Sequence, residues 1–292
     1  MPAGVIAFRC AVVFLIAHVL ALGLGMFGLL SAVPNVAQFA NNPYALAFYN
    51  WALVNTGAVD IQTGALAMFA YGCARVGARR TLVFFLAATL VSAAAELTGT
   101  KTGWPFGGYQ YLGFLGLKLA GRVPYTVPLS WFYMGFASFL LARTIVGDAA
   151  GRKRAVFAVV LGAWLLTAWD LVLDPAMASD KMTVMHFWVW KEHGAYFGMP
   201  LRNLAGWFGT GLAFMALTRV AWGALPAQRF WELKPVAFGW FPFALYAVNV
   251  VWAMTLGVSV GLWLAALAAF VVSLVPAALA LRRPARAIAV AA

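Results

Sequence analysis

Charged residues are scarce in this chain of 292 residues. Only 10 % of its residues are Asp, Glu, Lys or Arg, whereas 64 % are hydrophobic and the mean hydropathy is +0.88. Soluble domains carry about 25 % charged residues, so this composition excludes an ordinary soluble protein. Apolar runs long enough to cross a bilayer recur along the whole length. The sequence therefore predicts an all-α, polytopic membrane helix bundle, with residues 1–292 forming a single transmembrane domain.

Cysteine and histidine are also scarce. The two cysteines, Cys10 and Cys73, show no CxxC spacing, so we expect neither a disulfide nor a metal site from them. Only three histidines are present, His18, His186 and His193, whereas membrane di-iron hydroxylases and desaturases need a much larger set. His186 and His193 could share a helix face, but a lone pair is a weak metal signal. We expect a structural role for each histidine and no metal.

Nucleotide and nucleophile motifs are missing as well. The chain has no GxGxxG followed by an acidic residue, no Walker loop and no GxSxG elbow. The glycine-rich GWPFGG, residues 103–108, lacks the lysine of a Walker loop. For an enzyme, this leaves acid–base chemistry without a cofactor.

Eight membrane spans are expected, with both termini in the cytoplasm. The spans run at about residues 5–30, 52–74, 81–98, 126–143, 155–174, 203–222, 236–254 and 257–281. The loops after spans 2, 4 and 6 and the C-terminal tail carry most basic residues: Arg75, Arg79, Arg80, Arg143, Arg152, Lys153, Arg154, Arg219, Arg229, Lys234, Arg282, Arg283 and Arg286. The opposite loops carry only Lys101, Lys118, Arg122, Lys181, Lys191 and Arg202. Basic residues mark the cytoplasmic side, which also accounts for the net charge of +12 without a nucleic acid.

Two long outer loops, residues 99–125 and 175–202, are rich in Trp, Tyr, Phe and Gly. Aromatic residues are common at the headgroup level of any membrane protein. However, these loops are longer than a simple turn needs, and long ordered loops often carry function. We expect that they could fold back as a cap over the bundle.

Acidic residues gather near the outer ends of the spans. Asp60, Glu96, Asp170 and Asp174 lie on polar stripes of spans 2, 3 and 5, and Pro175 is expected to end span 5 just after Asp174. A carboxylate at a helix end can simply reach water. That explanation is weakest for Asp60, about 12 Å inside its span, and for Asp170, one turn deeper than Asp174. We therefore expect spans 2, 3, 5, 6 and 7 to enclose a polar chamber.

Carboxyl groups inside an apolar chamber are suited to proton transfer. Burial disfavours their charged form, and neighbouring carboxyls can divide into a protonated acid and a basic carboxylate. Aromatic faces attract cations, so acid groups with aromatic walls would suit a carbocation intermediate. The alternative explanation for most of these aromatic residues is an interfacial belt.

One sequence motif favours a different kind of enzyme, a prenyltransferase. Asp170-Leu-Val-Leu-Asp174 is a DxxxD motif, which resembles the second Mg²⁺–diphosphate motif of UbiA-type membrane prenyltransferases. Their first Asp-rich motif should lie in an early helix, where this chain reads VNTGAVDIQTG with one acid. Their diphosphate site also faces the cytoplasm, whereas DLVLD is expected on the other side. The match is therefore partial.

Four stretches together resemble the integral-membrane carotenoid-biosynthesis family. This family contains the carotenoid 1,2-hydratases, among them the hydratases of γ-carotene and of bisanhydrobacterioruberin. The stretches are E-x-x-G-x-x-x-G-x-P-F-G-x-Y-x-Y at 96–111, V-P-x-x-V-P at 123–128, W-D-x-x-x-D-P at 169–175, and W-x-W followed by G-A-Y-x-G-M-P-x-x-N-x-x-G-W at 188–207. The resemblance extends from about span 2 to span 6.

The resemblance implies a cofactor-independent hydratase of the bacterial or archaeal cytoplasmic membrane. It would add water to the terminal C1–C2 double bond of an acyclic (ψ) carotenoid end, such as that of lycopene or γ-carotene, through a tertiary carbocation. The expected acid–base set is Asp60, Glu96, Asp170 and Asp174. The expected substrate-binding residues are Trp104, Phe106, Tyr109, Tyr111, Trp169, Trp190, Tyr196, Asn203 and Trp207. Expected partners are a carotenoid drawn from the bilayer, membrane lipids and other carotenoid enzymes, while a non-enzymatic lipid or pigment carrier is a third alternative.

Overall fold

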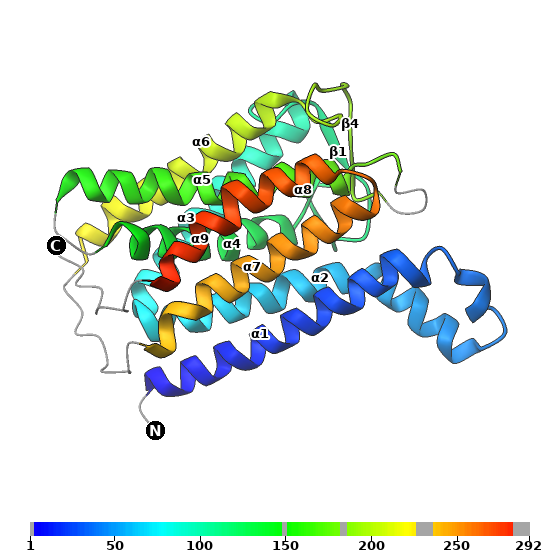
Figure 1. Ribbon diagram of the computed structural model, residues 1–292, viewed down its shortest axis with the longest axis horizontal. Coiled ribbons are helices and arrows are strands. Elements are labelled where there is room, and N and C mark those ends of the chain that lie inside the picture. Colours follow the sequence, from blue (N-terminus) through cyan, green and yellow to red (C-terminus); the bar gives the residue numbers. More distant parts are fainter. Residues whose placement is uncertain (1–2, 148–150, 182–185, 226–235, 283–292) are drawn as a thin grey trace.

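The computed structural model describes residues 3–147, 151–181, 186–225 and 236–282, which form a bundle of long helices (Figure 1). The helices are α1 (Ala3–Phe27), α2 (Pro43–Arg75), α3 (Ala78–Thr102), α4 (Thr126–Val146), α5 (Arg152–Met177), α6 (Leu201–Gly223), α7 (Val236–Ser259), α8 (Trp263–Ala269) and α9 (Val275–Ala278). Short π- and 3-10 segments join them: η1 (Gly28–Ala32), η2 (Val36–Phe39), η3 (Phe270–Leu274) and η4 (Leu279–Arg282). The predicted all-α bundle is confirmed.

Seven helical segments of the described chain are long and apolar enough to cross a bilayer, which makes this a multi-pass membrane protein. They are Ala3–Ala32, Ala78–Thr102, Thr126–Val146, Arg152–Met177, Leu201–Gly223, Trp240–Ser259 and Trp263–Arg282. The eighth expected span lies within α2, which is long enough but carries more polar residues, among them Asn55, Asp60 and Gln62. α2 packs along α1 through most of its length (Figure 1).

The described chain begins and ends at the same end of the bundle (Figure 1). This arrangement agrees with an even number of crossings, but the side of the membrane on which that end lies stays a prediction. Four of the basic residues behind the predicted orientation, Arg229, Lys234, Arg283 and Arg286, lie outside the described residues.

The two long loops meet at the opposite end of the bundle, through short strands. β1 (Tyr109–Tyr111) pairs antiparallel with β4 (Trp188–Trp190), with Tyr109 opposite Trp190. β2 (Lys118–Leu119) pairs with β3 (Val123–Pro124) within the first loop. Glu192 reinforces this junction, because its carboxylate accepts a hydrogen bond of 2.8 Å from the Gly108 N–H and pairs with Arg202. The Gly108 N–H and the Arg202 guanidinium hold the pKa of Glu192 below its usual value.

α5 continues past the residue where the sequence predicted its end. Pro175 lies inside the helix, which ends at Met177. A proline in the last turn removes one helical hydrogen bond without blocking the few residues that follow, so the predicted end at Asp174 was too early.

α4 occupies the centre of the bundle. Among the seven segments that are long and apolar enough to cross a bilayer, α4 has the largest share of buried residues. It packs against α2, α3, α5 and α7. Gly162 of α5 lets α4 and α5 approach closely, because a Cβ at Gly162 would lie 3.2 Å from the Cα of Phe139 on α4. Small residues at helix crossings are a common means of close packing in membranes.

Candidate active site

A cavity of about 250 Å³ lies at the end of the bundle where β1 and β4 lie, and residues of both strands line it. Its lining comes from α1, η1 and α2, and from α3 to α7 with the two paired loops. Most of the lining is aliphatic or aromatic. Three of the described acidic residues reach it: Asp60 from α2, Glu96 from α3 and Asp174 from α5. The cavity thus gathers carboxyl groups from three separate helices inside an apolar wall.

Glu96 lies near the C-terminal end of α3 and is almost fully buried. Its Oε1 accepts a hydrogen bond of 3.0 Å from Trp131 Nε1. Its Oε2 accepts from the Tyr111 hydroxyl at 3.0 Å and also from the Tyr109 hydroxyl. Gly99, one turn later, makes room for this arrangement, because a Cβ there would lie 2.8 Å from Phe106. The glycine therefore allows the chain to fold back after α3 and place both tyrosines on the carboxyl group.

Both tyrosine hydroxyls retain their protons in this setting. Burial first, and then the charge of Glu96, raise the pKa of Tyr109 and of Tyr111 well above the usual value for a phenol. Each hydroxyl therefore has a proton with which it donates a hydrogen bond to Glu96.

Asp170 and Asp174 share one amide donor. Asn203 Nδ2, from the first turn of α6, donates to Asp170 Oδ2 at 2.8 Å and to Asp174 Oδ2 at 2.5 Å. Both carboxyl groups are buried and lie within reach of each other, as their i, i+4 spacing on α5 requires. Asp174 lines the cavity and Asp170 lies behind it. The other Asp170 oxygen, Oδ1, is buried and accepts no hydrogen bond from the described residues.

Tryptophan rings form the wall between Glu96 on one side and the pair of Asp170 and Asp174 on the other. Trp131 and Trp207 stack with centroids 4.1 Å apart, and Trp169 meets Trp207 edge to face at 5.9 Å. All three line the cavity. Trp131 and Trp207 cover one face of each other, and an uncovered indole face is the kind of surface that attracts a cation.

Asp60 belongs to a different polar cluster. His18 Nδ1 lies 2.7 Å from Asp60 Oδ1 and 2.9 Å from the Asp60 carbonyl oxygen. His18 Nε2 contacts Asn249 Nδ2 at 2.9 Å, and the Tyr133 hydroxyl donates to Asn249 Oδ1 at 3.0 Å. These contacts join α1, α2, α4 and α7. Asp60, Tyr133 and Asn249 line the cavity, while His18 is fully buried behind Asp60.

Several predicted substrate-binding residues lie outside the cavity. Trp104, in the turn after α3, is 71 % exposed and does not line the cavity, so its expected contact with substrate stays a prediction. The others support the site from behind. Phe106, Tyr109, Trp190, Tyr196 and Asn203 are not among the residues that line the cavity, whereas Tyr111, Trp169 and Trp207 are.

The predicted set of helices was also incomplete. Spans 2, 3, 5, 6 and 7 do contribute to the lining, but α1 and α4 contribute too, through residues such as Leu22, Trp131 and Tyr133. Sequence reasoning missed the roles of His18, Tyr133 and Asn249 in the Asp60 cluster. The sequence feature that could have indicated this cluster is His18, a histidine in the middle of an apolar helix. Among the residues the structure describes, no group of three or more His, Cys, Asp and Glu side chains is arranged to hold a metal ion.

Comparison with known proteins adds a family and one relative. The family model described as carotenoid biosynthesis protein matches residues 56–276 of this chain. A bisanhydrobacterioruberin hydratase from Haloarcula japonica is 34 % identical over 133 residues, which are 46 % of this chain and 43 % of that protein. The match thus covers less than half the length of that relative. No solved structure matches the chain.

Proposed function

Because this chain belongs to the carotenoid biosynthesis protein family, we propose that it is a carotenoid hydratase of a bacterial or archaeal cytoplasmic membrane. It adds water across the terminal C1–C2 double bond of an acyclic (ψ) end and yields a 1-hydroxy carotenoid. The observation that carries this proposal is the meeting of Asp60, Glu96 and Asp174 in one apolar cavity. An isolated alkene can be hydrated there because proton donors and an apolar binding surface occur together.

The first step is protonation of the alkene. Two carboxyl groups in contact in an apolar site do not ionise together, because the like charges repel, so the Asp170–Asp174 pair holds a proton. Glu96 and this pair form the acid side of the site, and one of these carboxyl groups gives its proton to C2. A positioned general acid of this kind contributes about 10²–10⁴-fold to the rate.

The second step is capture of a cation. Protonation at C2 leaves a tertiary cation at C1, which the faces of Trp131, Trp169 and Trp207 stabilise. The oxygen of a water molecule then forms the C1–O bond, and the proton that it releases passes to a carboxylate. One proton is consumed at C2 and one is released from water, so the reaction needs neither an oxidant nor a reductant.

Expression in cells that accumulate lycopene or γ-carotene tests this function. The proposal predicts pigments that have gained one water, and cells that carry an Asp170→Asn variant should accumulate unchanged pigment. A gain of isoprene units that requires Mg²⁺ and a diphosphate would instead support a prenyltransferase that uses Asp170 and Asp174. Bound polyene recovered unchanged from the wild-type protein would support a carrier.

A further inference from the structure

The hydrogen bonds around His18 fix the position of its proton. Asn249 Nδ2 donates to the Leu245 carbonyl oxygen at 2.8 Å, so the amide nitrogen, and not the amide oxygen, faces that carbonyl and His18. Asn249 Oδ1 accepts from the Tyr133 hydroxyl. His18 Nε2 therefore accepts a hydrogen bond, and in the neutral ring the proton lies on Nδ1, which faces Asp60. This network turns Nδ1 toward Asp60, where the N–H donates to the Asp60 carbonyl oxygen at 2.9 Å and Nδ1 lies 2.7 Å from the carboxylate Oδ1.

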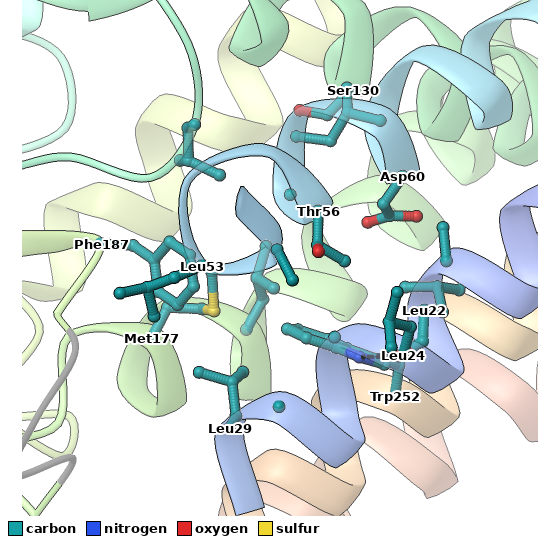
Figure 2. A pocket seen from close by; sticks show the side chains of 18 of the residues that line it. Leu22, Leu24, Leu29, Leu53, Thr56, Asp60, Ser130, Met177, Phe187 and Trp252 are labelled. Atoms are coloured by element: carbon teal, nitrogen blue, oxygen red, sulfur yellow. Dashed lines mark hydrogen bonds between the residues drawn. The ribbon is translucent and has the colours of Figure 1, made fainter. Parts of the chain in front are cut away.

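Asp60 is held against the histidine on one side and borders the cavity on the other. Its side chain is 16 % exposed, whereas His18 is fully buried. Figure 2 shows Thr56 and Asp60 on the same side of α2, with Leu22, Leu24 and Trp252 facing them across the hollow. Thr56 and Ser130 also line the cavity, so two hydroxyl groups occur in the lining together with the Asp60 carboxylate. A water molecule in the cavity needs polar partners of this kind.

The sequence makes specific room for this pair. Gly64 lies one turn after Asp60 on α2, and a Cβ there would lie 2.9 Å from His18 Cε1. The glycine lets the imidazole ring of α1 reach the backbone and side chain of Asp60. A histidine–carboxylate pair within membrane-spanning helices is costly unless it has a function or strong partners.

We propose that the lining residues Thr56, Asp60 and Ser130 hold the water that attacks the carotenoid, and that Asp60 is the base that receives its proton. This inference rests on the proposed hydratase function and assigns the second step to a place separate from the acid side. As the C1–O bond forms, one O–H bond of water breaks and its proton passes to the Asp60 carboxylate. His18 is a positioning residue: its Nδ1 bonds to the Asp60 carbonyl oxygen and lies 2.7 Å from the carboxylate, and the ring touches no substrate. The proton then returns to the acid side through water in the cavity, which completes the cycle.

Deuterium labelling separates the two steps. The purified protein is reconstituted in lipid vesicles with an acyclic carotenoid in deuterium oxide, and both the alcohol and the recovered polyene are analysed by mass spectrometry. Without the base, the cation still forms but loses a proton instead of capturing water. An Asp60→Asn variant should therefore make at least about 100-fold less alcohol while its recovered polyene gains deuterium. A Glu96→Gln or Asp170→Asn variant should give neither alcohol nor deuterium in the polyene.

Two further variants keep the test decisive. Thr56→Val removes only a hydroxyl group, and it should lower the ratio of alcohol to deuterated polyene even if the Asp60 variant does not fold. The matched control is Asp180→Asn, which makes the same change at an exposed acid and should behave as wild type.

Three outcomes would overturn the inference. One is wild-type alcohol formation by Asp60→Asn, and another is a wild-type product ratio for Thr56→Val. The third is an Asp60→Asn protein that melts at the wild-type temperature yet labels no polyene, because Asp60 would then act in the protonation step. A wild-type protein that makes no alcohol contradicts the hydratase function itself, which is a different result.

Discussion

At the scale of single residues, Glu96 is the most completely hydrogen-bonded of the cavity acids. One indole and two phenol donors converge on its two oxygens. Replacing Glu96 by Gln keeps the shape but removes the acid and turns one oxygen acceptor into a donor that faces another donor. We expect this variant to lose about 10²–10⁴-fold in hydration rate. The measurement is product formation in vesicles, with Asp180→Asn as the exposed control. Activity within twofold of wild type would remove Glu96 from the mechanism.

Asn203 connects α6 to α5 at this site through its side-chain hydrogen bonds. Its amide serves Asp170 and Asp174 together, so Asn203→Leu would leave two buried carboxyl groups without that donor. We expect the free energy of unfolding to fall by about 1–3 kcal/mol or more, because a buried polar group without a partner bears its full desolvation cost. Thermal unfolding in a mild detergent measures the change. Asn35→Leu, on an exposed turn, should leave the melting temperature nearly unchanged, and an equal loss in both variants would contradict this explanation.

Local patterns in the sequence indicated the acids but not their partners. The i, i+4 stripes and the depth of each acid within its span pointed to Asp60, Glu96 and Asp174, all of which line the cavity. The contacts of His18 could not be predicted this way, because Asp60 and Asn249 are 42 and 231 residues away in the chain. Such contacts depend on how whole helices pack, and a period of 3.6 residues carries no information on that.

At the scale of elements, the turn between β4 and α6 positions the start of α6. Gly194 pairs with Gly198 in this turn, and a Cβ at Gly194 would lie 2.0 Å from the backbone of Met199. Gly194→Ala must therefore displace Met199, which contacts Asn203. A shift of about 1 Å in a catalytic group can cost 10²-fold in rate, so we expect a loss of that order.

A matched glycine tests this explanation of the turn. Gly113 lies in the other loop, with open space around the position of a Cβ. Gly113→Ala should retain wild-type activity in the same assay. Hydrogen exchange should rise around residues 194–200 in the Gly194 variant alone. Wild-type activity and exchange in both variants would show that the turn tolerates a side chain.

Helices were predictable from the sequence because their apolar runs are long. Their ends were less so: α2 begins at Pro43, about nine residues before the expected span, because Asn42 caps it and accepts hydrogen bonds from Tyr44 and Ala45. The strands β1 and β4 were expected only as parts of loops. Their pairing joins segments about 80 residues apart, which alternation within three residues cannot reveal.

At the scale of the whole molecule, the cavity is small compared with a long polyene. An apolar cavity of about 150 Å³ holds a benzene ring, so one of about 250 Å³ accommodates the end of a carotenoid but not its whole length. The α1–α2 hairpin projects beyond the other helices (Figure 1). Phe27, Gly28 and Phe48 of this hairpin line the cavity. We therefore expect the remaining chain to lie along this hairpin, in lipid.

A bulky residue on the hairpin should obstruct this route. Gly28 lines the cavity and has open space around its Cβ position, whereas Gly23 has similar space but does not line the cavity. Gly28→Trp should lower kcat/KM for a long carotenoid by about tenfold or more, a usual degree of steric discrimination in an apolar pocket. Gly23→Trp is the control and should remain near wild type. Equal rates for the two variants would place the entrance elsewhere.

The most direct test of the central claim follows the oxygen atom. The purified protein in lipid vesicles receives an acyclic carotenoid in water labelled with heavy oxygen, with no added metal or cofactor. Our account predicts a carotenoid alcohol whose hydroxyl oxygen comes from the labelled water, formed by the wild-type protein and lost in Glu96→Gln. An alcohol whose oxygen comes from molecular oxygen, or a polyene that returns unchanged from an intact and folded wild-type protein, would contradict it.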